Sequence, residues 1–507
     1  MVSKNKKIQE LLSLYKEIYL LGKISAVLGY DMNVSLPEAA ADGRAAQSAY
    51  VTQLISEKWL SKKLRNLLEE VENESDLTET EKAIIRNLNW QGKYYFKVPQ
   101  SLVVEFSKTT SQAFMAWQKA KREDSFADFL PHLKKVVNIC QLIADHLGYK
   151  GNPYDALLDL YEPGLTFSQV KAIFDELRSK LKDLLKSVQG SKKYNEIVAL
   201  SQKYFSENAN YPVEHQRQIA LFVARKLGYD FTAGRLDVSA HPFTETLGRD
   251  DVRITTRYKV NDFRDSLASA IHEVGHALYE QGVLRDYEYT PIDGGVSLGI
   301  HESQSRFWEN QIGRSYEFIS FIEPILHTLF NDQVGKADKE ELHLLFNIVK
   351  PSLIRVEADE VTYNLHIALR FEIEEALINK KIKPEDLPGI WREKMRDYLG
   401  VVPETDREGV LQDVHWSYGS IGYFPTYTLG NLYAAQFANA MRKEINFAEK
   451  VSKGEFGAIL SWLRSNIHQH GSLYWPSELC KRITGEDLNP NYLLDYLQEK
   501  YTNLYLG

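Results

Sequence analysis

Apolar residues recur at intervals of three and four along most of this chain, and this spacing favours a mainly α-helical fold. Leu11, Leu14 and Ile18, for example, would lie on one face of a helix. Prolines fall mostly at the edges of the periodic segments, where helices tolerate them. The helical pattern is interrupted near the middle of the chain, resumes after residue 298 and runs nearly to the end. Before the interruption, helices are predicted over residues 6–29, 41–58, 80–95, 99–121, 131–146, 167–187, 192–206 and 213–227.

The pattern changes near the middle of the chain, where β-branched residues alternate with polar ones. Residues 237–240 and 251–258 are predicted to form short strands. Another strand is expected within residues 284–297, beside the turn at residues 293–295. No Gly/Ser linker, low-complexity tract or repeat divides the chain. The predicted fold class is therefore mainly α: a single large helical unit with a small β-sheet, forming one domain over residues 1–507.

The charge balance and the cysteine content narrow the classes of partner. The net charge is −8, and beyond the short N-terminal run at residues 4–7 no basic cluster suggests nucleic-acid binding. Cys140 and Cys480 form neither a CxxC motif nor a disulfide framework, which favours a reducing compartment. The N-terminus does not resemble a signal peptide, and no run of about 18 apolar residues occurs. We therefore expect a cytoplasmic protein that binds neither nucleic acid nor membrane.

The strongest chemical signal is the H-E-x-x-H motif at residues 272–276, which lies within an apolar helical stripe. His272 and His276 would lie one turn apart on one face of the helix. Both imidazoles could then reach a single zinc ion at about 2.0–2.1 Å. Glu273 lies about 100° round the helix from His272, so it can contact a water on the metal without being a ligand.

The context of the motif supports a functional interpretation. Asn261 or Asp262 can cap the start of the helix, and Gly282 can end it. Chance would place an H-E-x-x-H somewhere in a chain of this length in about a few per cent of sequences or fewer, judged from ordinary residue frequencies. A chance match would also have to fall on an amphipathic helix, which makes that alternative weaker.

A catalytic zinc site needs a third protein ligand and an open fourth position. No histidine follows at the metzincin spacing. Glu280 lies too close along the same helix, so Glu302, in the helix predicted over about residues 298–312, is the preferred ligand over an ordinary exposed acid. The neighbouring His301 fits a structural histidine or a substrate contact equally well.

Two later segments are unusually polar or aromatic. Arg355, Asp359 and Tyr363 follow helical spacing, which fits either a solvated helix face or the polar lining of a cleft. If the segment is helical and lines a cleft, Asp359 lies one turn beyond Arg355 and can orient it. Residues 409–416 and 419–427 combine glycines with aromatic side chains, which favours a tight, ordered loop.

Together these segments resemble the thermostable (Taq-type) metallocarboxypeptidase family. The resemblance runs from about residue 20 to the C-terminus, and the signatures follow the family's order, which is far more specific than H-E-x-x-H alone. The matching elements are His241-Pro242-Phe243 (HPF), Asp251 with Arg253 and Thr255 (DxRxT), His272 to His276 (HExxH), His301-Glu302-Ser303-Gln304 (HES), Ile354 to Asp359 (IRxxAD) and Gly409 to Trp416 (GxxQDxHW).

The resemblance implies an almost entirely helical fold with a small sheet beside the zinc site and a long, deep groove. Helices within about residues 1–120 are expected to form one wall of that groove. The family forms homodimers, and zinc or cobalt supports its activity. That activity is release of C-terminal residues from peptides with a free C-terminus, with broad specificity and poor use of a terminal proline.

The family's functional residues carry over to the matching positions. Its metal ligands correspond to His272, His276 and Glu302, and its general base corresponds to Glu273. Arg355 is the first candidate to hold the substrate's terminal carboxylate, and Arg253 is its competitor. The full set of expected substrate-binding residues is His241, Arg253, His301, Arg355, His415 and Tyr423.

The predicted reaction is hydrolysis of the C-terminal peptide bond by zinc-activated water, with Glu273 as general base. A zinc endopeptidase or oligopeptidase is one alternative, and it would not depend on a free C-terminus. A non-catalytic peptide-binding protein that retains metal is another. The second alternative is disfavoured because Glu273 has no purpose in a purely structural site, and structural zinc is usually four-coordinate and rich in cysteine.

Overall fold

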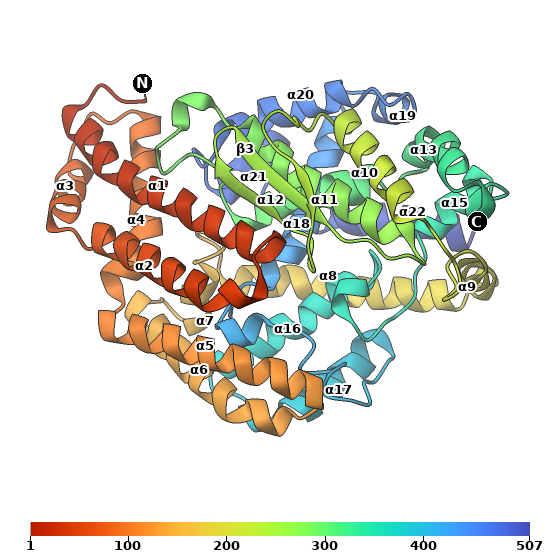
Figure 1. The fold of residues 1–507 in the computed structure, drawn as a ribbon, viewed down its shortest axis with the longest axis horizontal. Helices are drawn as coiled ribbons and strands as arrows, with labels where there is room; N and C mark the ends of the chain where they lie inside the picture. The colour runs from red at the N-terminus through yellow and green to blue at the C-terminus, as the bar shows by residue number, and fades with distance from the viewer. Residues whose placement is uncertain (1) are drawn as a thin grey trace. The chain divides into compact units, whose positions relative to one another are not determined.

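The computed structural model describes residues 2–507 and is 69% helical, with one three-stranded sheet (Figure 1). This confirms the mainly α fold class. The chain forms two compact units, and the single domain expected over residues 1–507 stays a prediction. Unit 1 comprises Met1–Gly92, Ala199–Phe346 and Tyr433–Leu488, and unit 2 comprises Lys93–Val198, Asn347–Leu432 and Asn489–Gly507.

The helices of unit 1 follow the predicted apolar periodicity. α1 starts after Asn5, whose side-chain oxygen accepts hydrogen bonds from the backbone N–H groups of Lys7 and Ile8. The helices that lie entirely in unit 1 are α1 (Lys6–Val34), α2 (Ala41–Trp59), α3 (Lys62–Glu72), α10 (Val213–Leu227), α11 (Phe263–Gly282), α12 (Leu298–Arg306), α13 (Tyr316–Leu329), α14 (Asn331–Val334), α15 (Lys339–Phe346), α19 (Phe447–Ser452), α20 (Phe456–Asn466) and α21 (Pro476–Thr484). Three helices have residues in both units: α4 (Glu79–Lys97), α9 (Lys193–Tyr204) and α18 (Pro425–Arg442).

The small sheet also belongs to unit 1. Its strands are β1 (Leu236–Val238), β2 (Thr244–Gly248) and β3 (Asp251–Thr256), in the order β1-β3-β2. β3 pairs in parallel with β1 and antiparallel with β2, and α11 packs against β3 (Figure 1). The two predicted strands are confirmed, whereas β2, which follows the HPF element, was not predicted.

The prediction of a strand within residues 284–297 is wrong. This segment forms one short 3-10 turn, Arg285–Tyr287, followed by a loop. Pro291 has no N–H to donate to a strand ladder, and the loop's polar groups bond to α11 instead. The N–H of Gly295 donates to the carboxylate of Glu280, and the N–H of Val296 donates to a side-chain hydroxyl of the same helix.

α11 and α12 approach each other closely at Gly275, inside the H-E-x-x-H motif. A Cβ atom at this position would lie 2.6 Å from the backbone oxygen of Gln304 and 2.6 Å from Cα of Ser305. Glycine is the residue that allows this approach, because it has no Cβ. Gly275 therefore sets the distance between the helix that carries the motif histidines and the helix that carries Glu302.

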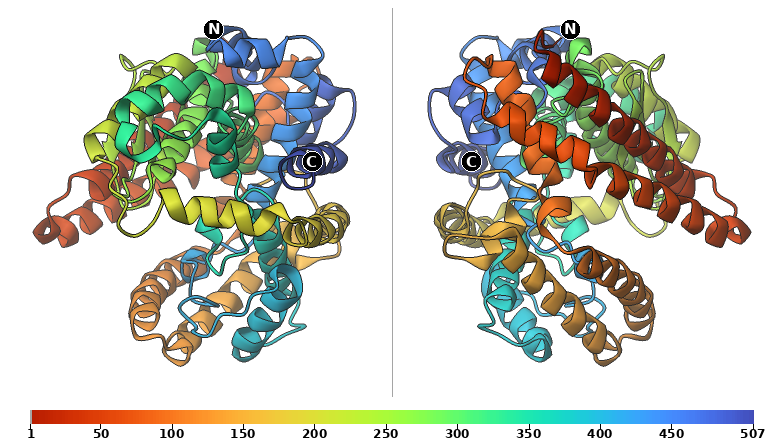
Figure 2. Two further views of the ribbon diagram at one scale, coloured as in Figure 1. Left: turned by 90° about the vertical axis from the view of Figure 1, so that its right-hand side faces the viewer. Right: turned by 90° about the vertical axis from the view of Figure 1, so that its left-hand side faces the viewer.

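Unit 2 is built from helices, and Figure 2 shows α5 and α6 lying side by side. α16 is buried along most of its length, so it is the central helix of this unit. The elements of unit 2 are α5 (Gln100–Glu123), α6 (Phe126–Leu147), α7 (Pro153–Leu158), α8 (Phe167–Gln189), α16 (Tyr363–Ile378), α17 (Leu387–Leu399) and α22 (Asn491–Tyr505), with the 3-10 turns Arg355–Glu357, Pro384–Asp386 and His415–Tyr418.

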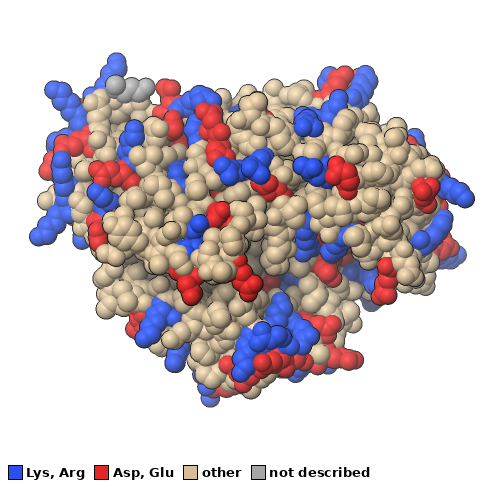
Figure 3. All heavy atoms as spheres, viewed as in Figure 1, with Lys and Arg blue, Asp and Glu red and all other residues tan. Residues whose placement is uncertain are grey.

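The surface and the cysteines agree with the composition. Acidic and basic side chains are interspersed on the face drawn in Figure 3, as the near balance of 61 basic and 69 acidic residues suggests. Within residues 2–507, no helix is long and apolar enough to span a bilayer. Cys140 and Cys480 are both buried and form no disulfide. The cytoplasmic location stays a prediction.

The contact at Gly275 can be tested by Gly275→Ala. The added methyl group meets backbone atoms that cannot rotate away, so overpacking should cost about 1–3 kcal/mol, more than the roughly 1 kcal/mol gained in helix propensity. The midpoint of urea unfolding should therefore fall. Gly29→Ala is the matched control, because nothing lies within 4 Å of a Cβ at that position of α1, and its midpoint should stay or rise. A rise in both variants would show that α12 yields freely.

Candidate metal centre

α11 holds the two motif histidines rigidly on one face. As predicted, the helix begins after Asp262, whose carboxylate accepts a hydrogen bond from the backbone N–H of Arg264, and it ends at Gly282. The rings of His272 and His276 lie one turn apart, with centroids separated by 4.9 Å. The predicted spacing of the imidazoles on one face is therefore present.

Glu302 reaches the same point from α12. Its Oε2 atom lies 3.6 Å from Nε2 of His272 and 3.4 Å from Nε2 of His276. The candidate ligand atoms of these three residues all lie within 4.8 Å of one another. Glu302, predicted as the third ligand from its place in the sequence, is thus brought together with the two histidines.

The spacing of these donors fits a metal ion. Two ligands bound at about 2.1 Å with a tetrahedral angle lie about 3.4 Å apart, close to the distances from Glu302 to the two imidazoles. Two imidazole nitrogens and one carboxylate oxygen form the donor set of a catalytic zinc site that keeps one position open. The residues present therefore fit a divalent cation.

The pKa shifts of His276 and Glu302 favour metal binding. Burial lowers the pKa of His276 to about 3, so its imidazole is neutral and able to ligate. Burial also opposes the protonation of His272, but the carboxylates of Glu302 and Glu309 outweigh it and raise the pKa of that histidine. Burial alone would raise the pKa of Glu302, yet Arg306 and the two imidazoles hold it well below its usual range. Glu302 is therefore ionised.

Glu273 is oriented by a residue of the sheet. The hydroxyl of Thr244, the first residue of β2, lies 2.7 Å from Oε2 of Glu273 and 2.9 Å from its backbone oxygen. Burial is the main influence that raises the pKa of Glu273. The carboxylate beside the two histidines is therefore fixed in place and holds a proton more readily than an exposed glutamate.

Glu309 lies behind His272. α12 continues as a π-helical turn over Phe307–Ile312, which is a part of the predicted helix 298–312. From this turn, Oε2 of Glu309 lies 2.9 Å from Nδ1 of His272. Arg306 and Arg314 donate hydrogen bonds to the two oxygens of the same carboxylate. Glu309 is thus an ionised acceptor on the side of His272 that faces away from Glu302.

His301 lies behind His276. Its Nδ1 atom is 2.6 Å from Nδ1 of His276, and its Nε2 atom is 2.9 Å from Oε1 of Glu280. The ring also packs at a tilt against Tyr279, with centroids 5.3 Å apart. Glu280, which was set aside as a metal ligand, therefore contacts the cluster through His301.

The other two predicted site residues of unit 1 belong to the sheet region. Arg253, on β3, donates two hydrogen bonds to Asp251, at 2.7 and 2.8 Å, and stacks on the ring of Tyr30. Its charge is therefore matched by a carboxylate two residues away. His241 is exposed in the segment before β2, and its backbone oxygen accepts a hydrogen bond from Ser239.

Unit 2 contains the remaining predicted site residues. The expectation that Arg355 lies on a helix with Asp359 one turn beyond it is wrong. Arg355 lies in the 3-10 turn Arg355–Glu357, before α16 begins at Tyr363. Asp359 caps the backbone of residues 361 and 362 rather than orienting Arg355. Helical spacing failed here because the chain is extended at Ala358, and Asp359 caps the backbone N–H groups of the turn that follows.

Asp413, of the GxxQDxHW element, is the partner of Arg355. Its Oδ1 atom accepts hydrogen bonds from Arg355 at 2.9 Å, and its Oδ2 atom accepts from Arg370 of α16 at 2.7 Å. Gln412 accepts from both residues. Two buried guanidinium groups thus share one carboxylate, and Arg355 and Arg370 hold the pKa of Asp413 far below its usual range despite burial.

His415 and Tyr423 lie together in the loop that follows. Their ring centroids are 5.4 Å apart, and Nε2 of His415 lies 3.2 Å from the hydroxyl of Tyr427. Burial lowers the pKa of His415 to about 4, so this imidazole is neutral at neutral pH.

Glu374, a fully buried residue of α16, holds this loop. Its carboxylate accepts hydrogen bonds from the indole of Trp416 at 2.9 Å, from the N–H of Gly422 at 3.0 Å and from the hydroxyl of Tyr154 at 2.8 Å. Burial raises the pKa of Glu374 to about 7. The ordered loop predicted from its glycines and aromatics is therefore tethered by one acid.

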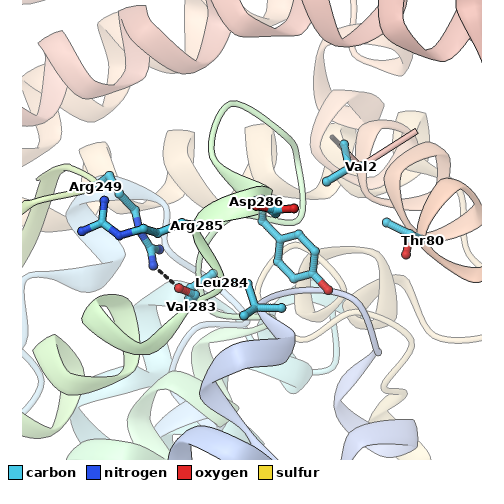
Figure 4. Close-up of a pocket in the computed structure, with 8 residues that line it drawn as sticks. Val2, Thr80, Arg249, Val283, Leu284, Arg285 and Asp286 are labelled. Carbon is cyan, nitrogen blue, oxygen red and sulfur yellow. Dashed lines mark hydrogen bonds between the residues drawn. The ribbon is translucent and has the colours of Figure 1, made fainter. Parts of the chain in front are cut away.

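A pocket of about 670 Å³ lies elsewhere in unit 1 (Figure 4). Arg249 bonds there to the backbone oxygen of Val283, and Arg285 pairs with Asp250. None of the residues that line this pocket belongs to the cluster of His272, His276 and Glu302. They are Val2, Thr80, Arg249, Val283, Leu284, Arg285, Asp286 and Tyr287.

Comparison with known sequences gives the family. Residues 10–501 match the family described as carboxypeptidase Taq (M32) metallopeptidase. The chain belongs to this family. Thermostable carboxypeptidase 1 of Pyrococcus furiosus is 43% identical over 502 residues, 99% of both chains, and that of Thermus thermophilus is 41% identical over 510 residues, 98% of both. A solved Pyrococcus furiosus carboxypeptidase has a TM-score of 0.94 to this structure and 43% identity, and covers 99% of this chain and 100% of its own.

Membership of the M32 family confirms the resemblance inferred from the motifs and makes this chain a metallopeptidase, for which a divalent metal is expected. Among residues 2–507, the donors of His272, His276 and Glu302 meet that expectation. Zinc and cobalt both accept nitrogen and oxygen ligands, so this donor set suits either ion.

Four residues of this M32 chain that support predicted site residues in one unit or the other were not foreseen from the sequence. Arg370 and Glu374 had a signal, because they are charged residues in an otherwise apolar helix. Glu309 had a weak one, as an acid seven residues after Glu302. Thr244 had none, because its partner lies 29 residues away.

The metal-ligand assignment can be tested by Glu302→Ala. A site with two imidazoles alone should bind Zn²⁺ far more weakly. The loss in affinity should exceed the change of about 10- to 100-fold that follows when a hydrogen-bond partner of a metal ligand is removed. Competition with a chelator measures the dissociation constant. Glu207→Ala, which removes an exposed glutamate of unit 1, is the control and should match the wild type. Unchanged affinity in Glu302→Ala would move the third ligand to another residue.

Proposed function

We propose that this M32 metallopeptidase is a zinc-dependent carboxypeptidase that removes the C-terminal residue from peptides with broad specificity. The observation that carries the proposal is the convergence of the donor atoms of His272, His276 and Glu302. The buried carboxylate of Glu273 belongs to the residue next to His272 on the same helix. The relatives named above are carboxypeptidases by name, which supports the substrate class.

Glu273 is the proposed general base. A zinc ion held by the three ligands would polarise the scissile carbonyl and acidify water. The carboxylate of Glu273 accepts a proton from the attacking water and passes it to the leaving amine. Its raised pKa brings it closer to the working pH, where a base that must also act as an acid is most effective, and Thr244 holds Oε2 in one orientation.

The general base can be tested by Glu273→Gln. The amide cannot accept the proton, so kcat should fall by about 100- to 10,000-fold, while Thr244 can still donate to the side-chain oxygen. Zinc affinity should stay near that of the wild type, since Glu273 is not a ligand in this proposal. This contrasts with Glu302→Ala, which should lose both. Turnover near the wild-type rate in Glu273→Gln would rule out this mechanism.

Arg355 is the proposed anchor for the terminal carboxylate of the substrate. Within residues 2–507, the ion-pair partner of both Arg355 and Arg370 is Asp413, so two guanidinium groups share one negative charge. Burying a substrate carboxylate requires such a cation, and a guanidinium group meets both of its oxygens. Arg253 suits the role less well, because Asp251 already engages it through two hydrogen bonds.

The remaining family assignments belong to the same proposal. His415 and Tyr423 are proposed donors that steady the oxyanion and the substrate, and the pKa of about 4 of His415 keeps it neutral for that purpose. His241 is proposed to contact substrate. From the family resemblance we also propose a single catalytic domain, a deep groove walled partly by the N-terminal helices, a homodimer, a cytoplasmic location, and activity with zinc or cobalt.

An endopeptidase with the same metal centre is the main rival. It would cleave a peptide with a blocked C-terminus as well as one with a free carboxylate. A carboxypeptidase with a buried cation for the terminal carboxylate would not, because an amide offers that cation no negative charge. A pair of peptides that differ only in C-terminal amidation therefore separates the two activities.

The anchor can be tested by Arg355→Ala with this pair of peptides. The variant should lose about 2–5 kcal/mol in transition-state stabilisation, measured from kcat/KM, on the free acid. The amide should be a poor substrate for the wild type and lose little more. Arg253→Ala is the matched control and should spare the difference between acid and amide. Equal losses on both peptides in Arg355→Ala would mean that this arginine supports the fold and not the substrate.

A further inference from the structure

The two candidate metal-binding histidines differ in what lies behind them. Nδ1 of His272 faces a carboxylate, Glu309, at 2.9 Å. Nδ1 of His276 faces instead a second imidazole, His301, at 2.6 Å. Since an imidazole nitrogen can be a donor or an acceptor, the direction of the second hydrogen bond has to be worked out from the rest of the network.

The ligand atoms fix that direction. Nε2 is the nitrogen of His276 that lies near Glu302, at 3.4 Å, so Nε2 must keep its lone pair free for a metal. A neutral imidazole then carries its proton on Nδ1, and Nδ1 of His276 donates to Nδ1 of His301. His301 must therefore hold its own proton on Nε2, which points at Oε1 of Glu280, 2.9 Å away.

Glu280 is suited to accept the hydrogen bond from Nε2–H of His301. The N–H of Gly295 also donates to it, at 3.1 Å. An ionised carboxylate only accepts hydrogen bonds, so Nε2–H of His301 is the donor in this contact.

The loop between α11 and α12 fixes the ring of His301. A Cβ atom at Gly295 would lie 2.6 Å from Cδ2 of His301 and 2.9 Å from Cε1 of Tyr279. The ring is thus enclosed by the loop backbone on one edge and by Tyr279, whose centroid is 5.3 Å away. The absence of a Cβ atom at Gly295 allows this enclosure.

We infer that His301 is a positioning residue that fixes the tautomer and the orientation of His276 for metal binding through a hydrogen-bonded series from Glu280 to His301 to His276. It does not act as a substrate contact. Such outer partners typically change metal affinity by about 10- to 100-fold. The inference rests on the proposed metal ligands, and it assigns functions to Glu280 and to Gly295.

Three variants test this with Zn²⁺ alone as the probe. His301→Phe keeps a ring of similar size but leaves Nδ1–H of His276 without an acceptor, so zinc affinity should fall about 10- to 100-fold. His301→Asn places its side-chain oxygen close to the position of Nδ1, so it should recover most of that loss. Glu280→Gln keeps an acceptor for Gly295 without the charge, and should give a smaller decrease in affinity. Chelator competition measures all three.

The metal-free protein gives an independent readout. In wild-type protein labelled with ¹⁵N-histidine, the signals of His301, assigned by their loss in His301→Asn, should be those of the Nε2–H tautomer. Thermal unfolding of each metal-free variant checks that the fold is kept. His301→Phe with wild-type zinc affinity, or His301 as the Nδ1–H tautomer, would overturn the inference.

The two levels of the argument fail in different ways. If Glu302→Ala binds zinc as tightly as the wild type, the proposed metal site itself is wrong. If Glu302→Ala weakens zinc binding while His301→Phe does not, the metal site stands and the positioning function of His301 is wrong. In that case a fall in kcat/KM with a raised KM in His301→Phe would identify His301 as a substrate contact.

Discussion

The contact between α11 and α12 at Gly275 is the constraint on which the candidate metal centre depends. The two histidines lie on one helix and Glu302 on the other, so the distances of 3.4 and 3.6 Å between their donor atoms exist only at this helix separation. Because the limiting atoms are backbone atoms of residues 304 and 305, the separation is set by the main chain and not by flexible side chains. A site built this way needs little rearrangement when a metal binds.

The charges around that contact are organised in two layers. The inner layer holds acceptors for a cation: two imidazoles and Glu302. Behind it, Glu309 accepts a hydrogen bond from His272 and Glu280 accepts one from His301, and Arg306 bonds to both Glu302 and Glu309. Carboxylates this close together would repel one another in a buried region without such a cation. The arginine therefore allows acids to support the ligands without competing with the site for a metal.

The parts of the structure that depend on neighbouring residues could be predicted from the sequence. Helix α11 was predicted to within a residue at its N-cap and its end, because Asp262 and Gly282 act locally. His272 and His276 were expected on one face because they lie one helix turn apart, and their rings do lie there. β2 and the loop at residues 284–297 were missed because β-pairing and the bonds from Gly295 and Val296 depend on partners elsewhere in the chain.

The environment of Arg355 shows the same limit more sharply. Its spacing to Asp359 and Tyr363 is helical, yet the chain is extended at Ala358 and Asp359 caps the turn that follows. The true partner, Asp413, lies 58 residues away. Nothing in the local pattern separates a carboxylate that caps a backbone from one that pairs with a guanidinium group. Local periodicity therefore drew attention to Arg355 and predicted the wrong partner for it.

α16 shows which sequence signal can reveal such long-range support. Arg370 and Glu374 are four residues apart, a spacing at which opposite charges on an exposed helix would pair with each other. Both are fully buried, and each bonds instead to the segment at residues 412–422: Arg370 to Asp413, and Glu374 to Trp416 and Gly422. A buried charge must be satisfied, so two charges within an apolar helix indicate that a polar loop packs there. In this chain, that loop carries His415 and Tyr423, and its rigidity follows from the helix beneath it.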